Sequence, residues 1–365
     1  MKKFVFKKDK KHWLRMVEKR NDRRKESKND KHLSTIGSKS LYANSKKREK
    51  VIMPKIVAPR IMLLKVSEYY NQFINFINDF ERLCKKANEL KFRFELDLSH
   101  IKEMYGDACV LFIASVDSMY QLYPNLKIKI RKPIKDITSR YDPHAVFCHL
   151  GFYKLFGLEY SADCSSENVV CWRYVTGDLA DGQLTEPLMK TLNDMGINTK
   201  ELYRSCIEGI ANAVEHAYIP QIKSSRDVRN KKWWMLLAKL DGKLLLFVYD
   251  RGHGIPSTLE YTQDQKILKE IWKKLKQLVS PTKDCLYIKA SMLVKETRTE
   301  LNYRGKGTGD IKSFIDKTEG NLLRIYSSRG TMIYKGESTP SFCYDNSISI
   351  NGTLLQWSIK LQDTI

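Results

Sequence analysis

The pattern of apolar and polar positions divides the first half of the chain into alternating extended and helical segments. From Glu68 to Leu90 the apolar residues recur every three or four positions, which predicts a helix with one buried face. Residues 92–98 alternate in the manner of a half-buried strand. Strand, helix, strand, helix, strand predicts a small mixed sheet with helices packed on it. The predicted elements are strand 56–64, helix 68–90, strand 92–98, helix 106–123 and strand 127–130.

The second half begins with a predicted helix over residues 201–218, whose apolar side chains can pack on a sheet. Two apolar runs, 233–240 and 244–249, flank Asp241-Gly242, which is a strong hairpin signal. Further strands are expected between residue 321 and the C-terminus. We therefore predict an α/β protein with three parts. They are a basic arm or linker 1–55, an α/β domain 56–158 and a second α/β domain 159–365.

The positive charge is concentrated in the arm. Residues 1–55 hold 20 Lys and Arg against 6 Asp and Glu, a net +14 of the total +22, which leaves +8 for the rest. Such a segment is too polar to fold alone, so we expect it to be disordered or a short amphipathic helix. It could contact nucleic acid, with Phe6 and Trp13 available to stack, or be a solvated tail that a protein partner orders. An anionic membrane surface is a third alternative.

Cysteine and histidine spacing gives no clear metal site. The eight cysteines include no C-x-x-C, so we expect free thiols in a reducing cytoplasm. His144 and His149 are five residues apart, which favours core or surface histidines over ligands. No apolar run approaches the length of a membrane span, and the charged N-terminus lacks a secretory signal.

One predicted helix carries a carboxylate and a carboxamide on the same face. Glu208 and Asn212 stand four residues apart, so their side chains lie on one side of the helix. The amide oxygen of Asn212 is a hard, neutral ligand for Mg²⁺, and the carboxylate of Glu208 can orient or deprotonate a water molecule. Such a pair is common on solvated helix faces, so its meaning depends on the motifs that follow.

Two glycine-containing segments follow this helix. The apolar strand 244–249 ends in the D-x-G-x-G sequence of residues 250–254, and residues 304–310 read RGKGTGD before a helical segment. Glycine lets a ligand approach the backbone closely, and N–H groups at a helix start form an anion site. The second segment is not a Walker A loop, because no G-K-[ST] follows. The candidate anion site consists of Arg304, Gly305, Lys306, Gly307, Thr308 and Gly309.

The order E-x-x-x-N, D-x-G-x-G, G-x-G-x-G resembles the GHKL superfamily of ATP-binding domains, found in gyrase, histidine kinases and MutL. The continuation A-x-x-H-A-Y after Asn212 is closest to the anti-sigma-factor serine kinases. The resemblance covers residues 185–362. It implies a Bergerat-type α/β sandwich with a mixed sheet that binds ATP and Mg²⁺.

The resemblance also implies a role for each motif. Asp250 would accept a hydrogen bond from the adenine amino group, which would discriminate against the guanine carbonyl. Ile255 and Pro256 would form an apolar wall, and Thr353 is the first choice, before Thr331, for a threonine beneath the adenine. Glu208 is the catalytic candidate and Asn212 the Mg²⁺ ligand. The expected ATP-binding set is Asn212, Asp250, Gly252, Gly254, Ile255, Arg304, Gly305, Lys306, Gly307, Thr308, Gly309 and Thr353.

Two expectations concern the surroundings of this site. Residues 257–303 resemble an ATP lid that would order over the nucleotide, an ordinary insertion being the alternative. Because the sequence ends soon after the last predicted strand, we expect no transducer domain of the gyrase or MutL type.

The segment DLSHIKEMYGDACVLFIASV is similar to the STAS family of anti-sigma antagonists. There a strand ending in Asp precedes an Asp-Ser phosphoacceptor. Here Asp97 ends the strand, Asp107 opens the helix and Ala108 replaces the serine, while Ser99 comes too early. The resemblance implies a docking module that is not phosphorylated and that binds a protein partner. A generic α/β packing domain is the alternative.

Three functions follow as hypotheses. The first is an ATP-binding GHKL protein with slow Mg²⁺-dependent hydrolysis in a regulatory, stress or defence role. The second is a protein serine kinase of the anti-sigma type. The third is a nucleic-acid-binding protein switched by nucleotide. A histidine autokinase is disfavoured because no phosphoacceptor histidine precedes the ATP domain on a dimerisation helix, and a homodimer is left open.

Overall fold

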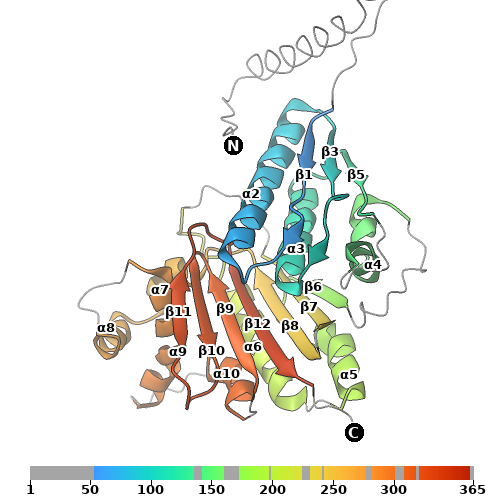
Figure 1. The fold of residues 1–365 in the computed structure, drawn as a ribbon. Coiled ribbons are helices and arrows are strands. Elements are labelled where there is room, and N and C mark those ends of the chain that lie inside the picture. Colours follow the sequence, from blue (N-terminus) through green and yellow to red (C-terminus); the bar gives the residue numbers. More distant parts are fainter. Residues whose placement is uncertain are drawn as a thin grey trace, which may run out of the picture.

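The computed structural model shows a mixed α/β protein built on one large sheet (Figure 1). Helices pack on both faces of this sheet, and a smaller α/β unit from the N-terminal half forms one of the two covering layers. No described helix is long and apolar enough to cross a membrane. The structure describes residues 53–134, 142–159, 172–196, 199–223, 231–240, 242–276, 282–300, 308–317 and 320–361.

The large sheet has seven strands in the order β11-β10-β9-β12-β8-β7-β6, and every neighbouring pair is antiparallel. The prediction of a mixed sheet is therefore wrong. Strands β8 and β9 run in the same direction, because a helical segment connects them. They do not form a parallel pair, however, because β12 lies between them and is antiparallel to both. The strands are β6 (Arg173–Gly177), β7 (Trp233–Leu240), β8 (Lys243–Asp250), β9 (Leu322–Ser327), β10 (Gly330–Tyr334), β11 (Phe342–Asp345) and β12 (Thr353–Lys360).

The central strands are buried on both faces, which explains their nearly continuous apolar sequences. Alternate side chains point to opposite layers, so Trp234 and Phe247 face the N-terminal unit whereas Trp233 and Val248 face the other helices. That second layer contains the 3₁₀ turn η2 and six helices. They are η2 (Gly182–Thr185), α5 (Glu186–Asp194), α6 (Thr199–Glu215), α7 (Ile255–Thr262), α8 (Gln265–Lys274), α9 (Asp284–Glu300) and α10 (Thr308–Asp316).

The N-terminal unit contains a three-stranded parallel sheet in the order β1-β3-β5, so the mixed sheet predicted here is also wrong. Each pair of these strands is joined through a helix, and such crossovers make strands parallel. The single strand predicted over residues 56–64 is broken at Pro59 into two strands that join different sheets. The elements are β1 (Lys55–Val57), β2 (Ile61–Met62), α2 (Ser67–Leu90), β3 (Phe94–Asp97), β4 (Glu103–Met104), α3 (Gly106–Leu122), β5 (Ile128–Arg131), α4 (Pro143–His149) and η1 (Phe152–Phe156).

The N-terminal unit and the large sheet share one hydrophobic core. A continuous cluster of buried side chains runs from α2 and α3 to β7, β8, β9 and β12. The contact at Gly106 is so close that an added Cβ would meet the Phe247 ring at 2.5 Å. The Tyr70 hydroxyl also donates to the Ile348 carbonyl at 2.7 Å, which links α2 to the loop before β12. The boundary near residue 158 stays a prediction, because packing across it is continuous.

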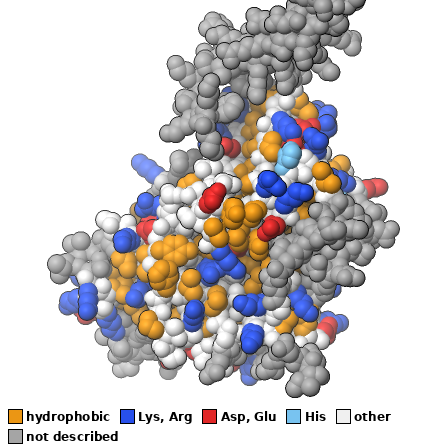
Figure 2. All heavy atoms as spheres, viewed as in Figure 1, with side chains coloured by type: hydrophobic (Ala, Val, Ile, Leu, Met, Phe, Trp, Pro, Cys, Tyr) orange, Lys and Arg blue, Asp and Glu red, His pale blue; other side chains and the backbone are white. Residues whose placement is uncertain are grey.

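Part of the sheet face beside the N-terminal unit is open. Figure 2 shows hydrophobic side chains gathered there, over the strands β9 to β11. Phe342 on the edge strand β11 is 62% exposed, and its ring centroid lies 5.6 Å from that of Tyr344. Phe342 is therefore a phenylalanine of the same sheet that lies outside the hydrophobic core.

The acids singled out in the N-terminal unit occupy the predicted places. Asp97 ends β3, and Asp107 lies in the first turn of α3, where burial raises the pKa of its carboxyl. Ala108 is fully buried, so the position of the family's serine lies inside the core. The resemblance to STAS itself stays a prediction.

Asp97 is expected to make stability depend on acid pH. Burial raises the pKa of its carboxyl, but the Lys55 ammonium and the Ser99 hydroxyl and N–H outweigh this effect and hold the pKa at about 2, below 3.8. Because the folded pKa is the lower one, the stabilisation is present above about pH 4 and is lost as pH falls toward about 2; it is about 2 kcal/mol. Urea unfolding across this range measures it. Asp97→Asn should flatten the profile, and an unchanged profile in that variant would contradict the assignment.

Helix α4 carries two histidines, His144 and His149, and one cysteine, Cys148. His144 Nδ1 lies 2.8 Å from the Tyr153 hydroxyl, which suits a core histidine, and His149 is exposed. Among the described residues, no group of three or more His, Cys, Asp or Glu could hold a metal ion. The free-thiol prediction holds for five cysteines but is wrong for Cys148, which is disulfide-bonded.

Candidate functional site

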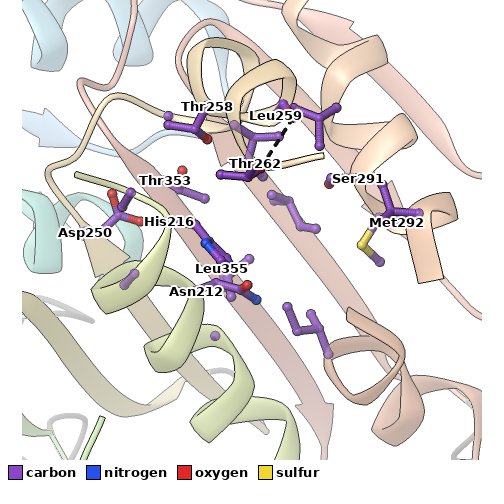
Figure 3. Close-up of a pocket in the computed structure, with 18 of the residues that line it drawn as sticks. Asn212, His216, Asp250, Thr258, Leu259, Thr262, Ser291, Met292, Thr353 and Leu355 are labelled. Atoms are coloured by element: carbon purple, nitrogen blue, oxygen red, sulfur yellow. Dashed lines mark hydrogen bonds between the residues drawn. The ribbon is translucent and has the colours of Figure 1, made fainter. Parts of the chain in front are cut away.

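A pocket opens between α6, the end of β8, β12 and the helices α7 and α9 (Figure 3). It contains about 820 Å³ of space, part of which is open to solvent. Most of its lining is apolar, and a few polar groups converge on it. The polar lining residues are Asn212, His216, Asp250, Thr258, Thr262, Gln263, Ser291 and Thr353.

Helix α6 lies close against the sheet and carries Asn212 into the pocket. Its buried residues Leu202, Cys206 and Ile210 recur every four positions and pack on the sheet. At Gly209 the approach is so tight that an added Cβ would meet Leu355 Cδ1 at 2.6 Å. Asn212, three residues further along, therefore lies at the pocket wall beside β12.

Glu208 is beside the pocket but is not among the residues that line it. Asn212 Nδ2 donates to Glu208 Oε1 at 3.3 Å, so the predicted pair is in contact. This bond directs the amide nitrogen toward the carboxylate and leaves the amide oxygen as the atom that a cation would meet. Glu201, seven residues before Glu208 on the same helix, forms an ion pair with Lys317 at 2.9 Å.

Asp250 stands at the end of β8 and faces the pocket (Figure 3). The Gly252 N–H donates to Asp250 Oδ1 at 2.8 Å, which fixes the carboxylate by a short local turn. Gly252 does not line the pocket, and its role is packing, since an added Cβ would meet the Ala217 carbonyl oxygen at 2.3 Å. Gly254 lines the pocket with φ of +82°, a conformation that favours glycine.

Thr353 lies beside Asp250 in the sheet, because the two residues are paired partners on β12 and β8. Its hydroxyl and that of Ser327 on β9 are 2.8 Å apart, and the Ile255 N–H donates to Ser327 Oγ at 2.8 Å. The first-choice threonine is thus in the pocket. Thr331, the second choice, is not among the lining residues, and its hydroxyl accepts a hydrogen bond from Asn346. Ser327 itself is buried and does not line the pocket, so it supports Thr353 from within the sheet, and a single serine in a strand carries no sequence signal for such a role.

The remaining wall was predicted only at Ile255 and, in outline, as the segment 257–303, so its other individual residues were not predicted. It is formed by α7, α9 and α10, whose helical patterns do not show which side faces a ligand. Ile288 and Met292 of α9 belong to the core shared with α6 and the sheet. Helix α9 is therefore part of the folded layer, and the lid over residues 257–303 stays a prediction. The lining residues from this wall are Ile255, Thr258, Leu259, Thr262, Gln263, Ser291, Met292, Val294 and Ile311.

The glycine loop is described only from Thr308 onward. Arg304, Gly305, Lys306 and Gly307 lie outside the described residues, whereas the backbone of Thr308 and Gly309 begins α10. Ile311, in the first turn of α10, lines the pocket. The N-terminal end of this helix therefore borders the site, where a helix start favours anions.

Comparisons with protein-family models, with curated proteins and with solved structures found no match. The resemblance to the GHKL and STAS families therefore rests on the motifs of this chain. The geometry adds that Asn212, Asp250, Gly254, Ile255 and Thr353 line one pocket.

Proposed function

We propose that this pocket binds ATP together with Mg²⁺. One observation carries the proposal: an amide, a carboxylate and a hydroxyl from three separate motifs, Asn212, Asp250 and Thr353, line the same pocket. The pocket also borders the start of α10. A purine would lie toward Asp250 and Thr353, and the phosphates would extend toward Asn212 and α10.

Asp250 would select adenine. Its carboxylate is largely buried and accepts hydrogen bonds, so it matches the exocyclic amino group of adenine, whereas the guanine carbonyl would leave it facing another acceptor. The Thr353 hydroxyl beside it, held by Ser327, can form a further hydrogen bond with the ring. Apolar neighbours such as Ile255, Leu259 and Ile325 exclude water from the faces of the base.

The chain's donor set fits a magnesium ion held mainly by phosphates. Mg²⁺ commonly takes one or two protein oxygens, with phosphates and water completing its shell. Asn212 offers an amide oxygen, and its nitrogen is engaged by Glu208. When bound, the metal would neutralise phosphate charge. Glu208 would orient a water molecule near Asn212 and accept its proton.

We propose slow hydrolysis as the reaction, with phosphoryl transfer to a protein serine as the second candidate. His216 of the A-x-x-H-A-Y sequence lines the pocket near Asn212, which favours retaining that candidate. Incubation with γ-labelled ATP and Mg²⁺, with and without candidate partners, separates the two. Release of free phosphate would support hydrolysis, and label on a partner serine would support the kinase. If neither product forms, the result would support a nucleotide switch. The proposed contact with nucleic acid involves the arm, of which only residues 53–55 are described.

Asn212→Ala is expected to lower Mg-ATP turnover about 100-fold, because the amide oxygen that holds the metal and the partner of Glu208 are both lost. The side chain is half-buried at a pocket wall, so the fold should survive. Phosphate release, with circular dichroism as the check on folding, measures the effect.

Asn193→Ala is the matched control, because Asn193 is exposed on α5 and is not a lining residue. It should retain full turnover. Equal rates of Mg-ATP turnover for the Asn212→Ala variant and the unmodified chain would contradict the proposed role of Asn212 as a magnesium ligand.

A further inference from the structure

The side chain of Arg251 points away from the pocket, although it lies between Asp250 and Gly252. Its Nη1 forms an ion pair at 2.7 Å with Glu81 Oε1 on α2 of the N-terminal unit. The two side chains are only 10% and 14% exposed. Ser115 on α3 donates its hydroxyl to the same carboxylate oxygen at 2.8 Å. One residue of the purine-recognition segment 250–254 is therefore anchored in the opposite layer of the protein.

The backbone of this segment has little freedom of its own. The N–H of Arg251 donates to the Tyr218 hydroxyl at 3.1 Å, and the N–H of His253 donates to the Ala217 carbonyl at 2.8 Å. Between them, Gly252 is packed against Ala217 and donates to Asp250. A displacement of Arg251 would therefore move the carboxylate of Asp250 as well.

A second bridge joins the same layers. Lys232 Nζ lies 2.6 Å from Asp117 Oδ2 on α3, and the Tyr218 hydroxyl donates to the Lys232 carbonyl at 2.7 Å. Trp234 Nε1 donates to the same Asp117 oxygen at 2.9 Å. Tyr218 thus lies between two ion pairs, and each uses a carboxylate of the N-terminal unit.

The Glu81–Arg251 pair is a strong constraint because it is buried. Burial alone lowers the pKa of the Arg251 guanidinium, but Glu81 and the neighbouring tyrosines raise it above its ordinary value. An unpaired charge is costly in a poorly hydrated interior, so the guanidinium of Arg251 has to stay paired with the carboxylate of Glu81. The pair therefore fixes the position of the segment rather than merely accompanying it.

We propose that Glu81, supported by Ser115, is a positioning residue for Asp250, so that the N-terminal unit sets the adenine selectivity of the pocket. This inference rests on the proposed ATP-binding function. It assigns to α2 and α3 a part in nucleotide recognition, although neither helix lines the pocket.

The test is Glu81→Gln in the full-length chain, with the dissociation constants of Mg-ATP and Mg-GTP measured by competition against a fluorescent ATP analogue. We expect the ratio of the two constants to fall about tenfold, because the neutral amide holds Arg251 less firmly. Partial unfolding would reduce binding of both nucleotides equally and would leave the ratio unchanged. Glu95→Gln is the matched control: Glu95 is also 14% exposed and pairs with Lys129 at 2.9 Å within the N-terminal sheet. In the Glu95→Gln variant, the ratio of the Mg-ATP and Mg-GTP dissociation constants should equal that of the unmodified chain.

Two further variants keep the proposal testable if Glu81→Gln does not fold. Ser115→Ala removes only the supporting hydroxyl and should lower the ratio about threefold. In an Arg251→Met background, Glu81→Gln should cause no additional change, since it acts through Arg251. An unchanged ratio in the Glu81 and Ser115 variants, or fully additive effects with Arg251→Met, would overturn the proposal.

The proposal and the function beneath it fail in different ways. If the unmodified chain binds no nucleotide, both are wrong. In the other case, the unmodified chain prefers ATP, the Asp250→Asn variant loses that preference and the Glu81→Gln variant keeps it. That result would show that only the positioning role of Glu81 is wrong.

Discussion

Replacing Asp250 by Asn is expected to weaken Mg-ATP binding about 100-fold while the chain stays folded. One carboxylate oxygen accepts a hydrogen bond from the Gly252 N–H at 2.8 Å, and the adenine amino group would donate a second hydrogen bond to the carboxylate. Asparagine has only one acceptor oxygen, so one of these two donors would face an NH₂ group. Titration calorimetry with ATP and GTP measures the loss, which should fall mainly on ATP.

Asp142→Asn provides the matched control. Asp142 is buried like Asp250 and accepts a hydrogen bond from the N–H two residues ahead, that of His144, at 2.9 Å. It caps α4 and does not line the pocket. ATP affinity should be unchanged in this variant. Equal affinities for Asp250→Asn and Asp142→Asn would contradict purine recognition by Asp250.

Phe247→Ala is expected to destabilise the whole chain by about 3–5 kcal/mol. Phe247 is fully buried on β8 and packs against the start of α3, so its removal leaves a cavity in the core that the N-terminal unit and the large sheet share. Urea unfolding should show one transition at a lower midpoint, observed alike by tryptophan fluorescence and by circular dichroism.

The control for this prediction is Phe342→Ala on the same sheet. Phe342 is 62% exposed, so its truncation should change stability by no more than about 0.5 kcal/mol. Two separate transitions in the unmodified chain, only one of them shifted by Phe247→Ala, would show that the halves fold independently.

The secondary structure was predictable where periodicity was long and uninterrupted. Helix α2 spans Ser67–Leu90 against a predicted 68–90, and β7 matches the predicted 233–240. The direction of strands was less accessible, because it depends on where β12 inserts, and that is decided by packing between segments far apart in sequence. A local run of apolar residues likewise hid the break at Pro59 between β1 and β2.

The candidate site was predictable for residues whose motifs have a fixed order. Asn212, Asp250 and Thr353 come from different elements, and all three line the pocket. Residues such as Ser291 on α9 and Gln263 after α7 could not be found, because helical patterns show which residues are apolar but not which polar ones face a pocket. The anchoring of Arg251 by Glu81 joins positions 170 residues apart along the chain, and neither residue type is unusual in its local sequence.

The most direct test of the central claim is a calorimetric titration of the purified chain with ATP in the presence of Mg²⁺, repeated with GTP. We predict saturable binding of one ATP per chain, at least about tenfold tighter than GTP. Absence of heat with ATP, or equal affinity for the two nucleotides, would contradict an adenine-selective pocket built on Asn212, Asp250 and Thr353.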